Sequence, residues 1–426
     1  MWESIGVFVI SLIIGVPIAF SLGTASLVYL FLKGVAFDLI AQRMFTGLDS
    51  FPFMAIPFFI IAGELMNSSG ITKKLVHLAD VLVGHIKGGL GHVVVVSSMF
   101  FAGITGSAVA DASAVGSMMI PAMTQEGFDL DYSAALTAAA AVTGPIIPPS
   151  IPFVVYALLS STSVAALFLA GVFPGILIGF SLMVVNYVIS SRRNYPRRAG
   201  WPKMKEIVVA VMHGIVPLLM PIIILGGILA GVFTATEASG VAVVYALVIG
   251  FLVYRNLDFK TLTNTLRSTA KTTGVVFLVI ACSNIFNWAL VVEQVPQAMA
   301  VFVSSVFQSR ELLLLAINIV LLIVGCFMEG TAAMIILVPI LLQITAGYGI
   351  HPVMLGAVVV LNLMIGLLTP PVGLCLFVVC GMTKLSIEKV TKQVLPFLAA
   401  EVAVLMLVTY VEPISMFLPR FFGYIR

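Results

Sequence analysis

The sequence predicts an all-α polytopic membrane protein with an inverted-topology repeat, two re-entrant helical hairpins and two broken helices. Of its 426 residues, 61% are hydrophobic and 9% are charged, and the mean hydropathy is +1.18, whereas a soluble domain carries roughly 25% charged residues. The only two Pro-Pro pairs, Pro148-Pro149 and Pro370-Pro371, each follow a glycine by four residues inside an apolar segment. These pairs lie 222 positions apart, and the basic residues gather in a few short stretches.

The composition leaves little room for anything but membrane helices. A spanning helix takes about 20 residues, so the chain can form about a dozen membrane segments. The first apolar stretch, from about Ile5 to Leu32, is too long for a signal-peptide core and follows Glu3 instead of a basic cluster, so we expect it to remain as a membrane anchor. The four cysteines lie in apolar segments without paired spacing, which predicts buried core residues. No basic stripe supports nucleic-acid binding.

The basic residues predict the topology, because cytoplasmic loops of membrane proteins are rich in Lys and Arg. From the most basic loop, 192–206, segments 164–191 and 131–160 cross the membrane, which leaves 92–126 with both ends inside. By the same tracing, 311–343 starts and ends outside, and 393–419 leaves the C-terminus in the periplasm. The clusters assigned to the cytoplasm are Lys73, Lys74 and Lys87; Arg192, Arg193, Arg197, Arg198, Lys203 and Lys205; Arg255, Lys260, Arg267 and Lys271; and Lys384, Lys389 and Lys392.

Segments 92–126 and 311–343 therefore predict re-entrant hairpins that turn near Gly103–Ser107 and Gly325–Thr331. Each hairpin precedes a broken helix and then a whole helix, in opposite orientations in the two halves. Pro174 and Pro396 repeat the 222-residue offset, which supports an inverted repeat. We expect the loop around residues 195–202 to join the halves, and the extra helix at 208–233 to supply the odd crossing that inverts the second half.

The breaks predict where the chemistry lies, because proline and glycine expose backbone groups that membrane depth tolerates only in a cavity or inside protein. Carbonyl and hydroxyl oxygens suit Na⁺, and half-helix N-termini attract anions. We expect at least two Na⁺ sites, with Asn362 one turn before Gly366 so that its amide reaches the break. The predicted Na⁺ ligands are Gly103, Thr105, Gly106, Ser107, Gly144, Gly325, Gly330, Thr331, Gly366 and Thr369, and the predicted substrate contacts are Ser107, Pro148, Pro149, Ser150, Asn362, Pro370 and Pro371.

Alternatives remain at this level. Small residues at the hairpin tips also suit close helix packing. Asp111 and Glu329 flank the tips and could neutralise a cation, carry a proton or hydrogen-bond the hairpin backbone. The chain has no Gly-x4-Gly-Lys-Ser/Thr loop for ATP, so concentrative transport would need an ion gradient. It also has no His-Glu-x2-His motif, and we expect no enzymatic activity. Repeated broken helices favour a carrier over a passive channel.

Two stretches resemble a known family. Gly103–Asp111 and Asn362–Gly373 are similar to the large membrane subunit of tripartite ATP-independent periplasmic (TRAP) transporters, and the resemblance covers the whole chain. It implies Na⁺-driven uptake of an organic acid across a bacterial inner membrane, with the acid delivered by a periplasmic substrate-binding protein. It also implies a small four-helix membrane subunit, and because no such domain precedes Met1, we expect a separate partner.

The resemblance further implies an elevator, in which a transport domain slides along a scaffold. The scaffold would be residues 1–91 and 187–310, the transport domain 92–186 and 311–392, and a C-terminal helix 393–426. Family solutes favour a sialic acid first and a C4-dicarboxylate second. The other function to weigh is a Na⁺- or H⁺-driven dicarboxylate carrier that works without a binding protein.

Overall fold

The computed structural model describes residues 1–198 and 200–425, and within these ranges the chain forms helices and no strand. This confirms the prediction that the chain is an all-α protein. The N-terminal elements are α1 (Trp2–Ile13), α2 (Ile18–Lys33), α3 (Asp38–Leu48), the 3-10 turn η1 (Phe51–Met54), α4 (Ala55–Ser68) and α5 (Ile71–Val83). The central and terminal elements are α11 (Met204–Leu229), α12 (Ala235–Val248), the π-helical turn η2 (Ile249–Val253), α13 (Phe259–Val292), α14 (Val295–Val306) and α20 (Pro413–Phe421).

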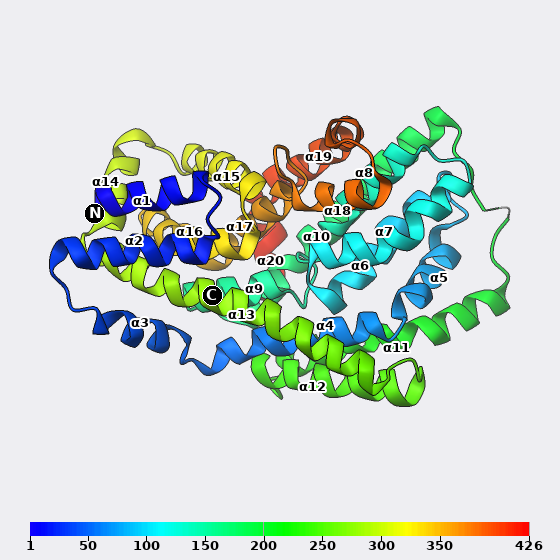
Figure 1. Cartoon of the computed structure of the whole chain (residues 1–426). Coiled ribbons are helices and arrows are strands. Elements are labelled where there is room, and N and C mark those ends of the chain that lie inside the picture. Colours follow the sequence, from blue (N-terminus) through cyan, green and yellow to red (C-terminus); the bar gives the residue numbers. More distant parts are fainter. Residues whose placement is uncertain (199, 426) are drawn as a thin grey trace.

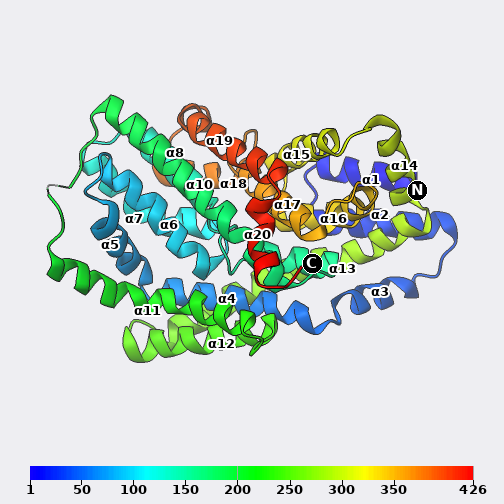
Figure 2. The same cartoon turned by 180° about the vertical axis from the view of Figure 1, so that it is seen from behind.

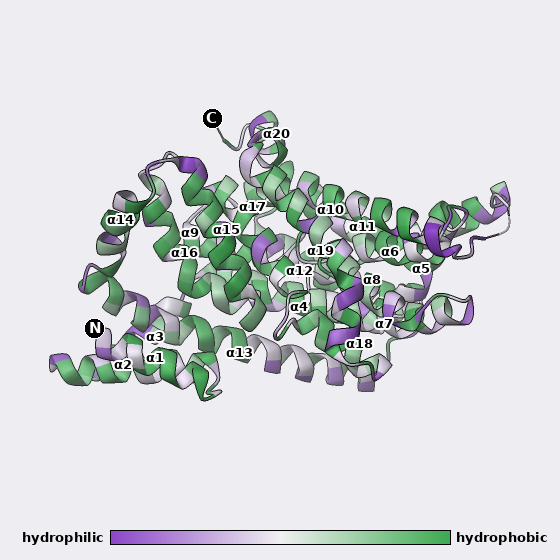
Figure 3. Cartoon of the chain, turned by 90° about the horizontal axis from the view of Figure 1, so that it is seen from above, coloured by the Kyte–Doolittle hydropathy of each residue, from purple (hydrophilic) through white to green (hydrophobic). Residues whose placement is uncertain are grey.

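The surface is that of a protein in lipid. Seven helices among the described residues, from η1–α4 to α19, are long and apolar enough to cross a membrane. Many large apolar side chains are exposed, including Ile13, Phe180 and Ile222, which a soluble monomer would avoid over such an area. Figure 3 shows hydrophobic residues along most helix bodies, with hydrophilic residues gathered mainly at helix ends and connections.

The first apolar stretch is two helices and not one. The structure ends α1 at Ile13 and begins α2 at Ile18, and the two helices pack against each other. Gly15 has φ +90°, a conformation that favours glycine, and Pro17 precedes the first turn of α2. The stretch from about Ile5 to Leu32 that we expect to be a membrane anchor is therefore a helical hairpin, and the Gly-Val-Pro sequence is the local cause.

The predicted repeat of elements is present in the structure. Each half has a helix–turn–helix pair, then two short helices separated by a non-helical break, then a long helix. Pro121 and Pro339 lie inside the second helix of each pair, and Pro174 and Pro396 lie inside the long helices. The first half is α6 (Gly89–Thr105), α7 (Ala108–Gln125), α8 (Leu130–Ala141), α9 (Ile151–Ser160) and α10 (Val164–Arg193), and the second is α15 (Arg310–Phe327), α16 (Gly330–Ala346), α17 (Pro352–Gly366), α18 (Leu374–Thr383) and α19 (Ile387–Tyr410).

The two halves exchange elements. α9, which follows the first break, packs against α16 and α17 of the second half. Reciprocally, α18, which follows the second break, packs against α7 and α8 of the first half. Figures 1 and 2 show α8, α10, α18 and α19 along one side of the molecule, while α4, α11, α12 and α13 lie along the opposite side. The two breaks therefore lie inside a body to which both halves contribute.

Two of the expected domain limits fall inside continuous helices. The limit after residue 186 lies within α10, which runs to Arg193, and the limit after residue 392 lies within α19. The expected C-terminal helix 393–426 is the rest of α19 followed by the separate α20. A helix continues across such a limit while its hydrogen bonds and packing continue.

Buried amides hold the body together. Asn186 on α10 is fully buried, its Nδ2 donates to the Gly88 carbonyl at 3.2 Å, and its Oδ1 accepts from the Tyr132 hydroxyl at 2.8 Å. This one side chain therefore links α10 to the start of α6 and to α8.

We expect Asn186→Leu to lower the free energy of unfolding by about 2–4 kcal/mol, because the buried Tyr132 and Ser190 hydroxyls both lose the Asn186 oxygen to which they donate. Thermal unfolding in detergent measures the change. Ser181→Ala, which removes only a hydroxyl bonded to the Ile178 carbonyl of the same helix, is the control and should change stability little. Equal stability of the two variants would contradict this role for Asn186.

Candidate functional site

The turn between α6 and α7, which we name tip 1 (residues 103–107), is built by its own sequence. Gly106 ends α6 with φ +59°, a conformation that favours glycine. Ser107 then caps α7, its hydroxyl accepting a hydrogen bond from the Ala110 amide at 3.4 Å. Thr105 donates its hydroxyl hydrogen to the Asp111 carboxylate at 2.5 Å. The hydroxyls predicted as ligands thus lie at the turn, where they also stabilise it.

Tip 1 lies directly against the first break (residues 142–150, break 1). A Cβ atom added to Gly103 would lie 3.4 Å from the Pro148 carbonyl oxygen. A Cβ on Gly106 would lie 3.2 Å from the Ile151 nitrogen and 3.6 Å from the Pro149 carbonyl oxygen. Glycine is required most clearly at Gly106, where φ is positive and a Cβ would be tight against the Ile151 nitrogen, whereas a Cβ on Gly103 would meet the Pro221 side chain at 2.9 Å. The predicted meeting of hairpin tip and broken helix is therefore present in the first half.

Asp111 extends this contact to Gly144. Its side chain is fully buried in the first turn of α7, and a Cβ on Gly144 would collide with its Oδ2 atom. Oδ1 accepts from Thr105, whereas Oδ2 has no hydrogen-bond partner among the described residues. One carboxylate oxygen at break 1 is therefore left without a partner, which buried polar atoms rarely are.

Two other features shape break 1. The Ser150 hydroxyl donates to the Pro145 carbonyl across the break and accepts from the Phe153 amide at the start of α9. Gly63 on α4 gives tip 1 a close neighbour on its other side, since a Cβ there would lie 2.9 Å from the Ile104 carbonyl oxygen. Tip 1 is thus held between break 1 and α4.

The turn between α15 and α16, tip 2 (residues 325–331), is capped by a carboxylate. Glu329 Oε2 accepts from the Ala332 amide at 3.1 Å, and Oε1 accepts from the Thr331 hydroxyl at 2.9 Å. A carboxylate at a helix N-terminus is favourable because the helix dipole is positive there. Both oxygens of Glu329 are therefore engaged, in contrast to those of Asp111.

Tip 2 lies against the second break (residues 367–373, break 2), and glycine backbone atoms contact each other where the two helices meet. A Cβ on Gly366 would lie 2.6 Å from both the Cα and the carbonyl carbon of Gly325. Gly330 lies against the Met364 side chain, and the Thr369 hydroxyl donates to the Ile365 carbonyl at 3.3 Å. The Gly373 amide donates to the Cys326 carbonyl at 3.4 Å. The second predicted pair of tip and break is present as well.

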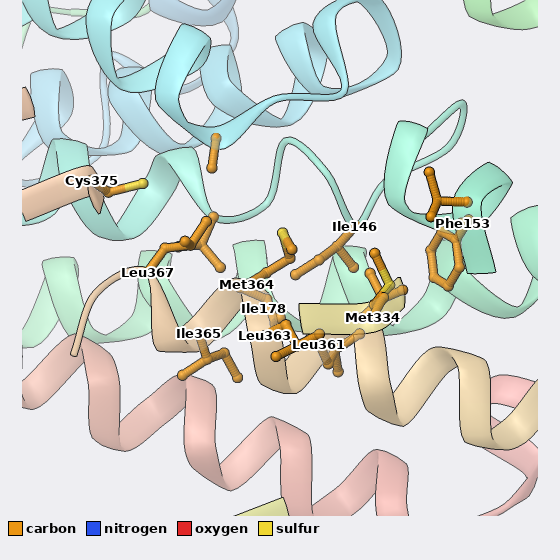
Figure 4. Close-up of a cluster of buried hydrophobic side chains, with 14 of the residues drawn as sticks. Ile146, Phe153, Ile178, Met334, Leu361, Leu363, Met364, Ile365, Leu367 and Cys375 are labelled. Carbon is orange, nitrogen blue, oxygen red and sulfur yellow. The ribbon is translucent and has the colours of Figure 1, made fainter. Parts of the chain in front are cut away.

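The two breaks differ in accessibility. Pro148 and Pro149 are buried, whereas Pro370 is half-buried and Pro371 is exposed. Apolar side chains connect the two regions, since Ile146 of break 1 lies beside Met364 of α17 and Met334 of α16 in one buried cluster (Figure 4). The described structure holds no cluster of three or more His, Cys, Asp or Glu residues suited to a metal ion. Any cation here would depend on carbonyl, hydroxyl and single carboxylate oxygens.

Asn362 makes its hydrogen bonds with helices and not with break 2, and its role as a substrate contact stays a prediction. Its amide nitrogen donates to Asn318 Oδ1 at 2.7 Å and to the Val358 carbonyl at 2.8 Å. Residues 362 and 366 do share a helix face, but α15 covers that face, so Asn362 meets Asn318 as Gly366 meets Gly325. Its Nδ2 atom joins two helices, while its buried Oδ1 atom has no hydrogen-bond partner among the described residues.

Sequence reasoning also missed a buried acid. Glu401 on α19 is fully buried, and neither of its carboxylate oxygens has a hydrogen-bond partner among the described residues. A glutamate within the apolar segment 394–408 was the signal that could have revealed it. Asn318 is likewise buried and donates to the Thr409 hydroxyl at 3.0 Å.

Comparison with known proteins identifies the family. Residues 5–414 match the family model of the tripartite ATP-independent periplasmic transporter, DctM component. The chain is 40% identical over 415 residues to the sialic acid TRAP transporter large permease protein of Vibrio cholerae, covering 96% of each. It is 41% identical over 413 residues to the isethionate TRAP transporter permease protein of Oleidesulfovibrio alaskensis, covering 97% of this chain and 65% of that protein.

A solved structure shares the fold. The crystal structure of the YdaH transporter of Alcanivorax borkumensis aligns with a TM-score of 0.60 and 12% identity, covering 84% of this chain and 86% of that one. This likeness concerns the fold alone. The family model and the large permease relatives carry the assignment. The chain belongs to the DctM family, the large permease component of the tripartite ATP-independent periplasmic transporters.

Proposed function

We propose that this permease couples the inward flow of Na⁺ to the uptake of an organic anion, with Na⁺ bound where each tip meets its break. The observation that carries the proposal is the Asp111 carboxylate at break 1, with Oδ2 facing Gly144 and lacking a hydrogen-bond partner among the described residues. A buried carboxylate without a partner is costly, and a bound cation would remove that cost. Na⁺ is cargo here, and it would enter and leave with the anion.

The donor set at break 1 suits Na⁺. Hard monovalent and divalent cations of this kind prefer oxygen ligands such as carboxylates and carbonyls. The carbonyl groups of Pro148 and Pro149 lie against tip 1, and neither accepts a hydrogen bond from the described residues. At tip 2 the Glu329 carboxylate is already engaged by Thr331 and Ala332. We therefore expect the site at break 1 to bind Na⁺ more tightly than the site at break 2.

The substrate is proposed to be an anion held near the helix N-termini that follow the breaks. α18 follows its N-cap residue Gly373 without a side-chain cap, and although the Cys375 amide donates to the Leu367 carbonyl, the N-terminus of this helix suits an acidic group. Relatives named for sialic acid and for isethionate are equally similar to this chain. Both substances are organic anions, one a carboxylate and the other a sulfonate. A sialic acid remains our first choice and a C4-dicarboxylate the second.

The partners follow from the family. We propose that a periplasmic substrate-binding protein delivers the anion and that a small four-helix membrane subunit packs on the exposed apolar surface, in a bacterial inner membrane. We also propose the elevator movement. The reciprocal packing of α9 and α18 favours it, because the two breaks would have to move together. The basic loops would face the cytoplasm and the C-terminus the periplasm.

Uptake into proteoliposomes tests the function. The chain is reconstituted with its small membrane subunit, and labelled sialic acid, isethionate and a C4-dicarboxylate are offered with their binding proteins. Uptake should require both the binding protein and an inward Na⁺ gradient. Transport of a dicarboxylate without a binding protein would instead establish the alternative carrier, and uptake driven by a proton gradient alone would refute Na⁺ coupling.

Binding of radioactive Na⁺ to the purified chain tests the site without the partners. We expect Asp111→Asn to weaken Na⁺ binding at least tenfold, since one charge contact with a desolvated cation is worth about 1.4 kcal/mol or more. Asp38→Asn is the matched control, because Asp38 also lies in the first turn of a helix but is exposed. Unchanged Na⁺ binding in Asp111→Asn would remove Asp111 from the site.

A further inference from the structure

Glu401 lies in the middle of the buried face of α19. The side chains on this face are fully or nearly fully buried, and Glu401 is 0% exposed. α19 packs against α8, α10, α17 and α18, so protein and not lipid surrounds this face. The other buried side chains on it are Val390, Val394, Phe397, Val404, Leu405, Val408 and Thr409.

The carboxyl group has no polar partner within the described residues. Both oxygens lack a hydrogen bond, and Glu401 takes part in no ion pair there. Polar contacts of α19 lie on either side of it, at Gln393, which donates to Asp131, and at Thr409, which accepts from Asn318. Each is eight residues away, about 12 Å along the helix axis. Glu401 is therefore isolated between two polar clusters.

No charged group on the neighbouring helices compensates it. The Cys375 thiol on α18 is fully buried, and a thiol carries no positive charge that could pair with a carboxylate. α17 carries no titratable side chain. Asp131, Tyr132 and Arg193 lie at the Gln393 end. The remaining titratable groups on the packed helices are Tyr187 and Arg192 on α10, Cys380 on α18 and Arg420 on α20.

An ionised carboxylate in such a place is very unfavourable, because no partner replaces its lost hydration. Adding a proton removes the charge and needs only one carboxylate oxygen. A Na⁺ ion would need several oxygen ligands, and the buried stretch of α8 beside this face is mostly alanine. We propose that Glu401 is a proton-binding site inside the body formed by both halves, separate from the two contacts between tips and breaks.

The proposal has a consequence for transport. The structure shown holds Glu401 neutral, and loss of the proton would place a bare charge among α8, α10 and α17. Alkaline pH should therefore disfavour this arrangement of helices. A variant that cannot ionise should not respond. Uptake by the wild type would fall as the pH rises, while uptake by a neutral variant would stay level.

Infrared spectroscopy tests the proton directly and does not depend on the coupling ion. The purified chain is labelled with carbon-13 glutamate, so that the carbonyl stretch of a protonated glutamic acid shifts while that of aspartic acid does not. We expect a shifted band at neutral pH that Glu401→Gln removes. Glu64→Gln is the control and should leave the band, because Glu64 accepts hydrogen bonds from the Ser268 and Thr269 hydroxyls. Absence of a Glu401-dependent band overturns the proposal.

The pH profile of reconstituted uptake is the second measurement. Above its titration point the protonated fraction of Glu401 falls about tenfold per pH unit, and wild-type uptake should follow, whereas Glu401→Gln should give a flat profile. Superimposable profiles would overturn the transport consequence. Glu401→Met, an apolar side chain of similar size, should also fold, since no polar contact is lost. Severe unfolding of both variants would show that the carboxylate is charged and paired, which would overturn the proposal.

Discussion

Replacing Gly366 with alanine should disrupt the contact between tip 2 and break 2. The new Cβ would lie 2.6 Å from two backbone atoms of Gly325, a distance that packed atoms do not adopt. No flexible side chain can move aside, so α15 and α17 would have to separate at the contact between tip 2 and break 2. Forced overpacking of this kind costs about 1–3 kcal/mol or more. We expect uptake to be lost and the unfolding temperature to fall.

The matched control is Gly381→Ala on α18, where no atom lies within 4 Å of an added Cβ. Alanine is favoured over glycine in a helix by about 1 kcal/mol, so this variant should be as stable as the wild type or more so, with normal uptake. Thermal unfolding in detergent and reconstituted uptake are measured for both. Normal uptake by Gly366→Ala would mean that α15 and α17 do not need close contact at this point.

Replacing Gly144 with alanine should weaken Na⁺ binding at break 1 strongly. The added Cβ would collide with the Asp111 Oδ2 atom, so the carboxylate must turn away from the break or the break must move. Gly226→Ala on α11 is the control, because no atom lies within 4 Å of a Cβ at that position. We expect Na⁺ binding and uptake to fall at least tenfold in Gly144→Ala alone, a loss equivalent to about 1.4 kcal/mol.

A double-mutant cycle separates this effect from a general disturbance. Suppose that Gly144→Ala weakens Na⁺ binding by displacing the Asp111 carboxylate. In a chain that already carries Asp111→Asn, adding Gly144→Ala should then lower the Na⁺ affinity little further. The double variant should bind Na⁺ no more weakly than Asp111→Asn alone, because residues in contact are not additive. Additive losses would show that the alanine disturbs break 1 independently of Asp111.

The sequence was sufficient to predict where the turns and the helix breaks of the site lie. Proline and glycine act on their own backbone, so the breaks at Gly144–Ser150 and Gly366–Gly373 and the turns at Gly106 and Met328 could be predicted from local chemistry. The repeat offset of 222 residues could be seen in the same way. A turn that depends on adjacent residues can be recognised from the sequence alone. The Gly15–Pro17 turn carried the same signal, although the first apolar stretch suggested one anchor.

Contacts between distant helices could not be predicted in that way. Asn362 shares a face with Gly366, but only the position of α15 decides that this face meets Asn318. The burial of Glu401 depends in the same way on four packed helices. The exchange of α9 and α18 between the halves has no sequence signature either, because an apolar ten-residue helix suits many neighbours.

The exchange of α9 and α18 has a consequence for biosynthesis. α9 leaves the ribosome long before α16 and α17 are translated, and at roughly 5–20 residues per second the delay is on the order of ten seconds or more. During that interval α9 can pack against α4 and α10, but the side that contacts α16 and α17 has no partner from its own chain. The nascent first half must therefore wait within the insertion machinery or in lipid, and its maturation can be completed only when the second half arrives.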